Sequence, residues 1–141
     1  VVAMDSLIHY EPGTALDACE ILTPADIEAI VDDAEVAAGE LKDRPTSLSP
    51  GRTECTYAGD WGRLIVQLTP EDGANSYDAA RRSYKDAVDI TGVGDGAFNS
   101  VAEKRAFVWK GAVSVMFTTF VNGIDRYDLA TALAKAVVAK L

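Results

Sequence analysis

Residues that bind zinc or carry redox chemistry are scarce in this sequence of 141 residues, which has one histidine and two cysteines. Cys19 and Cys55 lie too far apart for a Cys-x-x-Cys motif, and His9 alone cannot complete a familiar zinc ligand set. The Gly-x-Ser-x-Gly and His-Glu-x-x-His signatures of hydrolytic enzymes are also missing. We therefore expect no metal, no cofactor and no catalytic residue of a familiar kind.

Long apolar runs are missing as well. A membrane-spanning helix needs about 18 or more consecutive apolar residues, and the longest candidate, residues 112–121, is interrupted by Ser114, Thr118 and Thr119. The N-terminus lacks the basic and apolar regions of a signal peptide. Because the sequence does not begin with methionine, we expect that a targeting segment or a lipid anchor has been removed upstream.

Basic residues are scarce in the first half of the chain. Residues 1–70 contain 13 acids and 4 bases, whereas residues 71–141 contain nine of each. Ten acids and no base occur between Asp5 and Glu40, and the net charge is -9. Nucleic acid is therefore not an expected partner, because phosphate contacts need clustered Lys and Arg. The acidic run is typical of a solvated helix face; the alternative is a surface that meets cations or a basic partner.

The remaining composition is that of an ordinary folded domain. Apolar residues make up 48% and charged residues 25% of the chain, so disorder, collagen-like repeats and coiled coil are excluded. A chain of this length forms one core. Residues 1–16 have no sustained period and contain Pro12 and Gly13. We expect an irregular lead-in there, followed by a single domain over residues 17–141.

Three helices are predicted. Thr23, Pro24 and Asp26 supply an N-cap, a first-turn proline and a carboxylate that reaches back to the cap, so a helix is expected from there until Gly39. Two more helices are expected over residues 75–87 and 125–141, where apolar side chains recur at helical spacing.

Five strands are predicted between the helices, at residues 53–57, 61–68, 88–91, 105–109 and 113–121. Apolar side chains fall on both faces of the last strand, which predicts that it is central. Residues 40–52 are expected to form a turn-rich connection. The order α-β-β-α-β-β-β-α predicts an α+β domain with helices packed on a largely antiparallel sheet.

Gly92, Gly94 and Gly96 form the most conspicuous short motif. Glycine-rich loops that precede helices bind phosphate through their backbone N–H groups. Here the spacing is Gly-x-Gly-x-Gly, no Lys-Ser/Thr pair follows, and the next residues indicate loop and strand. The motif therefore predicts a tight turn between strands.

Four residues are candidates for contact with a ligand or partner. Tyr57 and Trp61 flank the predicted hairpin turn, where they form either an exposed aromatic platform or part of the core. Arg81 is either an anion contact or part of a solvated helix face. An active site would have to bring three polar groups into one pocket, namely Asp95, Arg81 and Asp60.

The two cysteines bear on the cellular compartment. A disulfide between Cys19 and Cys55 is typical of an exported protein, and closing a loop of that length would stabilise the fold by roughly 4 kcal/mol. Two buried free thiols in a cytosolic protein are the alternative.

Short motifs along residues 17–141 carry a family resemblance. They are DACEILTPAD at residues 17–26, CTY at 55–57, VGDGAF at 93–98 and the helix at 129–141. Together they resemble the small secreted lipoproteins of unknown function that are common in actinobacteria. The resemblance implies a Cys19–Cys55 disulfide, an exported and often lipid-anchored protein, and an architecture like that of PsbP-like domains. The sequence departs from the pattern by lacking the lipidated cysteine.

The resemblance brings no settled biochemical role. Our first hypothesis is a non-catalytic extracytoplasmic domain of the cell envelope, which binds an unknown small ligand or envelope protein. The face of the sheet or the loop at residues 45–51 is the expected contact surface. The alternatives are an enzyme of unrecognised type and a structural protein of envelope assembly.

Overall fold

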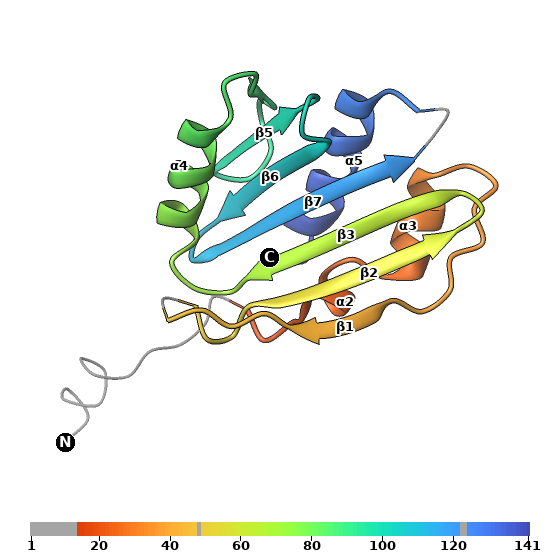
Figure 1. The fold of residues 1–141 in the computed structure, drawn as a ribbon, viewed down its shortest axis with the longest axis horizontal. Coiled ribbons are helices and arrows are strands. Elements are labelled where there is room, and N and C mark those ends of the chain that lie inside the picture. Colours follow the sequence, from red (N-terminus) through yellow and green to blue (C-terminus); the bar gives the residue numbers. More distant parts are fainter. Residues whose placement is uncertain (1–13, 48, 122–123) are drawn as a thin grey trace.

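Seven antiparallel strands form one sheet in the computed structural model, which describes residues 14–47, 49–121 and 124–141. Their order across the sheet is β1-β2-β3-β7-β6-β5-β4 (Figure 1). The strands are β1 (Glu40–Asp43), β2 (Thr53–Gly59), β3 (Gly62–Thr69), β4 (Val88–Asp89), β5 (Gly96–Ser100), β6 (Arg105–Lys110) and β7 (Val113–Val121). The predicted α+β class is confirmed, and β7 is the central strand, as its apolar residues on both faces predicted. Most of the expected lead-in, residues 1–13, lies outside the described residues.

The helices cover the two faces of the sheet unequally. They are α2 (Ala18–Ile21), α3 (Pro24–Ile30), α4 (Gly73–Ser83) and α5 (Arg126–Val138). Figure 1 shows α2, α3 and α5 behind the strands, whereas α4 lies in front at one end. The front helix contacts β6 and β7, so the front of β1, β2 and β3 is not covered by a described helix. None of the described helices is both long and apolar enough to cross a membrane.

The main core lies between the sheet and the three helices behind it. Alternate residues of the central strands point to this side, because side chains alternate along a strand. The largest fully buried core side chains on this side are Tyr57, Leu64, Val66, Leu68, Val108 and Phe117 from the sheet, Ile21, Ile27, Leu129 and Leu133 from the helices, and Leu22, which directly follows α2. Each such burial stabilises the fold by about 1.5–3 kcal/mol.

The start of α3 follows the predicted capping rules. The Thr23 hydroxyl accepts a hydrogen bond from the Asp26 backbone N–H, and the Asp26 carboxylate accepts one from the Thr23 N–H at 2.8 Å. The predicted end at Gly39 is wrong, because the helix ends at Ile30. The next residue, Val31, is extended, and the two aspartates after it favour turns over helix.

Two strands lie where loops were expected. Strand β1 falls within the predicted connection at residues 40–52, and β5 begins at Gly96, the last glycine of the motif. All four residues of β1 are exposed, so this strand is held by backbone pairing with β2 and has no alternating apolar pattern. Helix α4 is also displaced from the predicted 75–87, since it begins at Gly73 and ends at Ser83.

Candidate functional site

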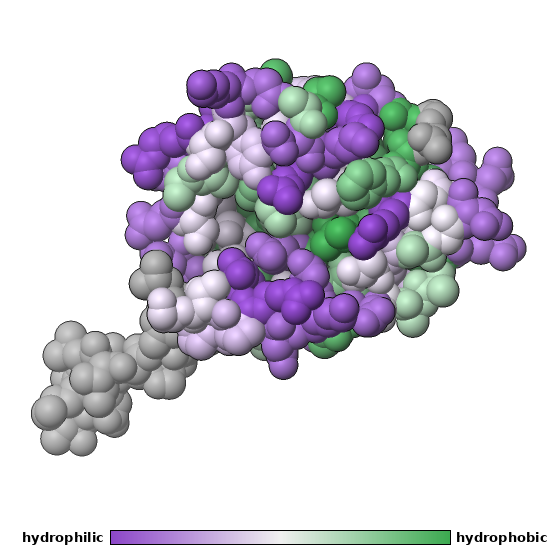
Figure 2. All heavy atoms as spheres, in the orientation of Figure 1, coloured by the Kyte–Doolittle hydropathy of each residue, from purple (hydrophilic) through white to green (hydrophobic). Residues whose placement is uncertain are grey.

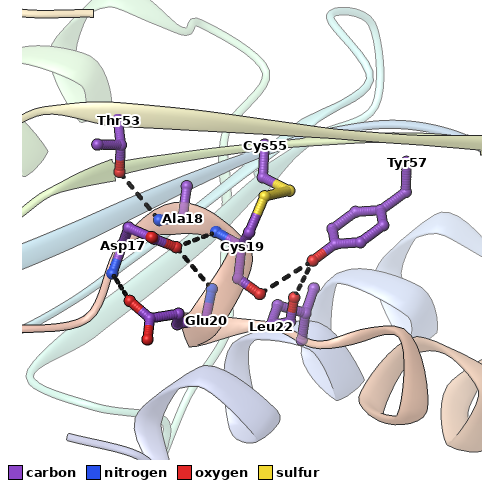
Figure 3. The surroundings of a disulfide bond; sticks show 8 residues. All are labelled: Asp17, Ala18, Cys19, Glu20, Leu22, Thr53, Cys55 and Tyr57. Atoms are coloured by element: carbon purple, nitrogen blue, oxygen red, sulfur yellow. Dashed lines mark hydrogen bonds between the residues drawn. A yellow bond between two sulfur atoms is a disulfide. The ribbon is translucent and has the colours of Figure 1, made fainter. Parts of the chain in front are cut away.

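Cys19 of α2 is bonded to Cys55 of β2, and their Cα atoms are 5.1 Å apart. The disulfide is therefore confirmed, and the alternative of two free thiols is excluded. Figure 3 shows the bond beside the Tyr57 ring, on the side of the sheet that carries α2. The bridge joins the first described helix to the sheet across 36 residues.

Tyr57 is a core residue, which is the second of the two alternatives that its position predicted, so it forms no part of an exposed platform. Its side chain is 1% exposed, and its hydroxyl donates hydrogen bonds to the backbone carbonyls of Cys19 and Leu22 (Figure 3). Burial, together with the negative charges of Asp17 and Asp26, raises the pKa of Tyr57 to about 12. The side chain thus holds α2 in place and offers no surface to a ligand.

Trp61 lies in the two-residue turn between β2 and β3 and is half-buried. Its indole covers Gly59, where a Cβ atom would lie 2.7 Å from the indole Nε1. It also lines an open cavity of about 710 Å³ together with the acidic residues Asp32, Asp33, Glu35 and Asp60. No set of three or more His, Cys, Asp or Glu side chains in the described part of the chain is arranged to hold a metal ion.

Arg81 and Asp95 both make contacts within the fold. The Arg81 Nε lies 3.0 Å from an Asp89 carboxylate oxygen, and its guanidinium lies over the Phe98 ring. The Asp95 carboxylate accepts a hydrogen bond from the Gly111 N–H at 2.8 Å.

The polar groups considered for an active site do not share one pocket. Asp60 lines the cavity beside Trp61, whereas Asp95 lines a separate hollow beside Gly92 and Gly94. Arg81 lines neither of these two hollows. The glycine motif links β4 to β5 as a turn, as predicted.

The front of the sheet carries a groove that the sequence did not indicate. Its inner part has a volume of about 250 Å³ and its outer part about 360 Å³. Arg52, Thr69 and Ser76 line both parts and join them. The inner part is completed by Gln67, Phe107, Ser114 and Met116, and the outer part by Thr46, Ser47, Ser49, Asp72, Asn75 and Ala79. Figure 2 views this side, where the surface is hollowed between α4 and the polar side chains of β1 and β2.

An aromatic cluster fixes α4 as one wall of the groove. The Tyr77 ring packs edge-on to Phe98 at 5.4 Å, and Phe98 stacks on Phe107 at 4.8 Å. Tyr84 also packs on Phe107, at 5.4 Å. Each such pair adds about 0.5–1.5 kcal/mol beyond the area it buries, so the wall is well anchored.

The opposite wall is the loop between β1 and β2. The Arg52 Nε–H donates to the Arg44 carbonyl at 2.8 Å, and the Arg44 N–H donates to the Arg52 carbonyl at 2.9 Å. These bonds hold the loop closed and fix the Arg52 side chain. Leu48, within the contact loop predicted at residues 45–51, lies outside the described residues.

The bases of the first half of the chain gather on this open face. Lys42 of β1 and Arg63 of β3 point to the groove side, by their register with Glu54 and Phe120. Arg44 pairs with Glu54 at 3.3 Å beside them, and Arg52 lines the groove. All four bases of residues 1–70 therefore lie on or beside one face, which their sequence positions alone did not indicate.

Comparison with protein-family models, with curated proteins and with solved structures finds no match.

Proposed function

We propose that this chain is a non-catalytic extracytoplasmic binding domain of the cell envelope, which holds a small ligand in the groove on the open face of its sheet. The observation that carries the proposal is the groove itself, because it lies where the sheet face meets the loop predicted to form the contact surface. Its two parts fall near the lower limit of the volumes that small-molecule sites have.

The lining of the groove supports recognition of a small molecule. Hydroxyl groups come from Ser49, Thr69, Ser76 and Ser114, and an apolar patch comes from Phe107 and Met116 beneath them. A few convergent polar groups around an apolar patch are typical of ligand sites.

Two further observations support the cellular location. The Cys19–Cys55 disulfide is of the kind that persists in oxidising compartments. The motifs at residues 17–26, 55–57 and 93–98 resemble those of exported actinobacterial lipoproteins. A lipid anchor upstream of this chain belongs to the same proposal.

The proposal is tested by screening the oxidised protein against a library of small organic molecules and measuring the melting temperature. We expect compounds that raise the melting temperature to lose this effect in the variant Ser76→Phe, because a phenyl ring there fills both parts of the groove. Ser83→Phe is the matched control, since Ser83 is an exposed serine of the same helix outside the groove lining.

Compounds that stabilise Ser76→Phe as strongly as the unmodified protein would contradict the proposed site. Turnover of any member of a substrate panel would contradict the non-catalytic role. Such turnover is the outcome that the enzyme hypothesis requires.

A further inference from the structure

We infer that the ligand of the groove is a small amphiphilic anion, namely a carboxylic acid with a short apolar chain. The inference rests on the proposed function and adds the chemical class of the ligand. It is carried by Arg52, Ser49 and the apolar patch of Phe107 and Met116.

Arg52 is the cationic group of the site. It is half-buried, and no carboxylate of the described residues lies within 4.0 Å of its guanidinium. Only its Nε is bonded within the described part of the chain. The terminal nitrogens can therefore form the paired hydrogen bonds by which guanidinium recognises carboxylate.

Ser49 supplies a second donor in the same hollow. Its side chain is 5% exposed, and its Oγ has no hydrogen-bond partner among the described residues. A buried hydroxyl without a partner destabilises the protein, because it has lost its hydrogen bonds to water. A ligand oxygen that accepts a hydrogen bond from it would remove this destabilisation.

The N-terminus of α4 borders the same hollow and favours the same charge. No side chain caps this helix of 11 residues, and Asn75 and Ser76 of its first turn line the outer part of the groove. The positive end of the helix dipole adds to the Arg52 charge. Asp72, which accepts a hydrogen bond from the Asn75 amide at 2.7 Å, is the one carboxylate of the lining.

The acidic cluster beside Trp61 lies away from the groove. The acids beside Trp61 lie at the hairpin end of β2, whereas Arg52 precedes the other end of that strand. A strand of seven residues spans roughly 20 Å, about twice the Debye length at physiological salt. The distant acids are therefore largely screened from an anion bound at Arg52.

The experiment titrates the oxidised, ¹⁵N-labelled protein with octanoate, 1-octanol and octylamine and maps the amide shifts. The three probes share one apolar chain and differ in the charge of the head group. We expect octanoate to shift the amides of Ser49, Arg52 and Ser76, and to bind at least ten-fold more tightly than octylamine. Arg52→Gln should lower the octanoate affinity about ten-fold and leave that of 1-octanol unchanged.

Arg63→Gln is the matched control, because Arg63 lies on the same face outside the groove lining. It should leave octanoate binding unchanged. Ser49→Ala provides a second variant should Arg52→Gln disturb the loop, and it should weaken octanoate several-fold.

Equal affinities for octanoate and octylamine, or octanoate binding that survives in both groove variants, would overturn the inference. If all three probes bind the groove equally, the ligand class is wrong while the binding site stands. If neither these probes nor any compound of the library binds the groove, the proposed function fails as well.

Discussion

Tyr57 donates a hydrogen bond to the backbone carbonyl of Cys19, whose sulfur is bonded to Cys55 two residues before Tyr57 on the same strand. One strand thus holds α2 by a covalent bond and by a buried phenol (Figure 3). Gly39 packs against the same two side chains, since a Cβ there would lie 2.2 Å from the Cys55 sulfur. The disulfide and the Tyr57 hydroxyl can be removed separately by substitution.

Replacing both cysteines in Cys19→Ala/Cys55→Ala should lower the free energy of unfolding by about 4 kcal/mol, because the unfolded chain regains the freedom of the 36-residue loop. Urea denaturation of the oxidised protein and of the variant measures the difference. Reducing agent should lower the stability of the unmodified protein and leave that of the variant unchanged. A variant as stable as the oxidised protein would show that the bridge does not constrain the unfolded state.

Tyr57→Phe should lower the free energy of unfolding by about 1–2 kcal/mol at neutral pH, because it removes the hydroxyl that donates to the buried Leu22 carbonyl and to the part-buried Cys19 carbonyl. Tyr127→Phe is the control, since that side chain is 37% exposed and should change the free energy by a few tenths of a kcal/mol. Urea denaturation at pH 7 distinguishes the two variants. Equal free energies of unfolding for the two variants would show that the Tyr57 hydroxyl does not help to hold α2.

The same tyrosine makes the stability fall in alkali. Its pKa is about 12 in the folded protein, above the ordinary value of 10.0, so the folded state holds the proton more tightly than the unfolded state does. This contribution is fully present below pH 10 and is lost as the pH rises through about 12. The free energy of unfolding of Tyr57→Phe should therefore fall less between pH 10 and 12 than that of the unmodified protein. Tyr77, whose burial also raises its pKa to about 12, contributes equally in both proteins.

Local signals in the sequence predicted much of the fold. The capping box at Thr23, the central position of β7 and the turn at Gly92 depend on neighbouring residues or on alternation within one strand, and all three are confirmed. Strand β1 could not be predicted in this way, because its four exposed residues lack an apolar period and it forms only by pairing with β2.

The groove could not be predicted either, because it depends on contacts between distant segments. Its wall is set by Tyr77 on Phe98 and by Tyr84 on Phe107, which are brought together only when the sheet is complete. In the sequence nothing separates Arg52 from the other bases; what distinguishes it in the structure is that it lines both parts of the groove and has no described carboxylate within 4.0 Å. The polar residues of β3 and β7, among them Gln67 and Ser114, were the one available sign of an open face.

Lys140→Met should make the protein less stable at neutral pH but not in acid. Burial alone would raise the pKa of Asp26, but hydrogen bonds from Lys140 and Thr23 outweigh burial and hold the pKa below its ordinary value of 3.8. The stabilisation is therefore present above about pH 4 and is lost as the pH falls through the folded-state pKa.

Because both side chains are partly exposed, we expect a loss of about 1 kcal/mol at pH 7. The difference from the unmodified protein should shrink as Asp26 becomes protonated. Lys135→Met, a change of an exposed lysine on α5, is the control. Denaturation curves of both variants at pH 7 and pH 3 test this prediction. If Lys140→Met loses the same stability at both pH values, the effect of Lys140 is due to packing and not to its ion pair with Asp26.

Asp72→Asn should raise the affinity of the groove for octanoate about three-fold, because it removes the one carboxylate that lines the site. Asn keeps the hydrogen-bonding side chain and tolerates the left-handed backbone that Asp72 adopts, with φ at 56°. The change therefore alters charge while the start of α4 keeps its conformation.

Asp33→Asn is a closely matched control, because Asp33 has φ at 58° and lines the distant acidic cavity beside Trp61. Both variants reduce the net negative charge by one. If repulsion by the whole protein limits anion binding, the two should raise the octanoate affinity equally. If the charge inside the groove determines the affinity, only Asp72→Asn should raise it. Isothermal titration of both variants with octanoate at one salt concentration separates these outcomes.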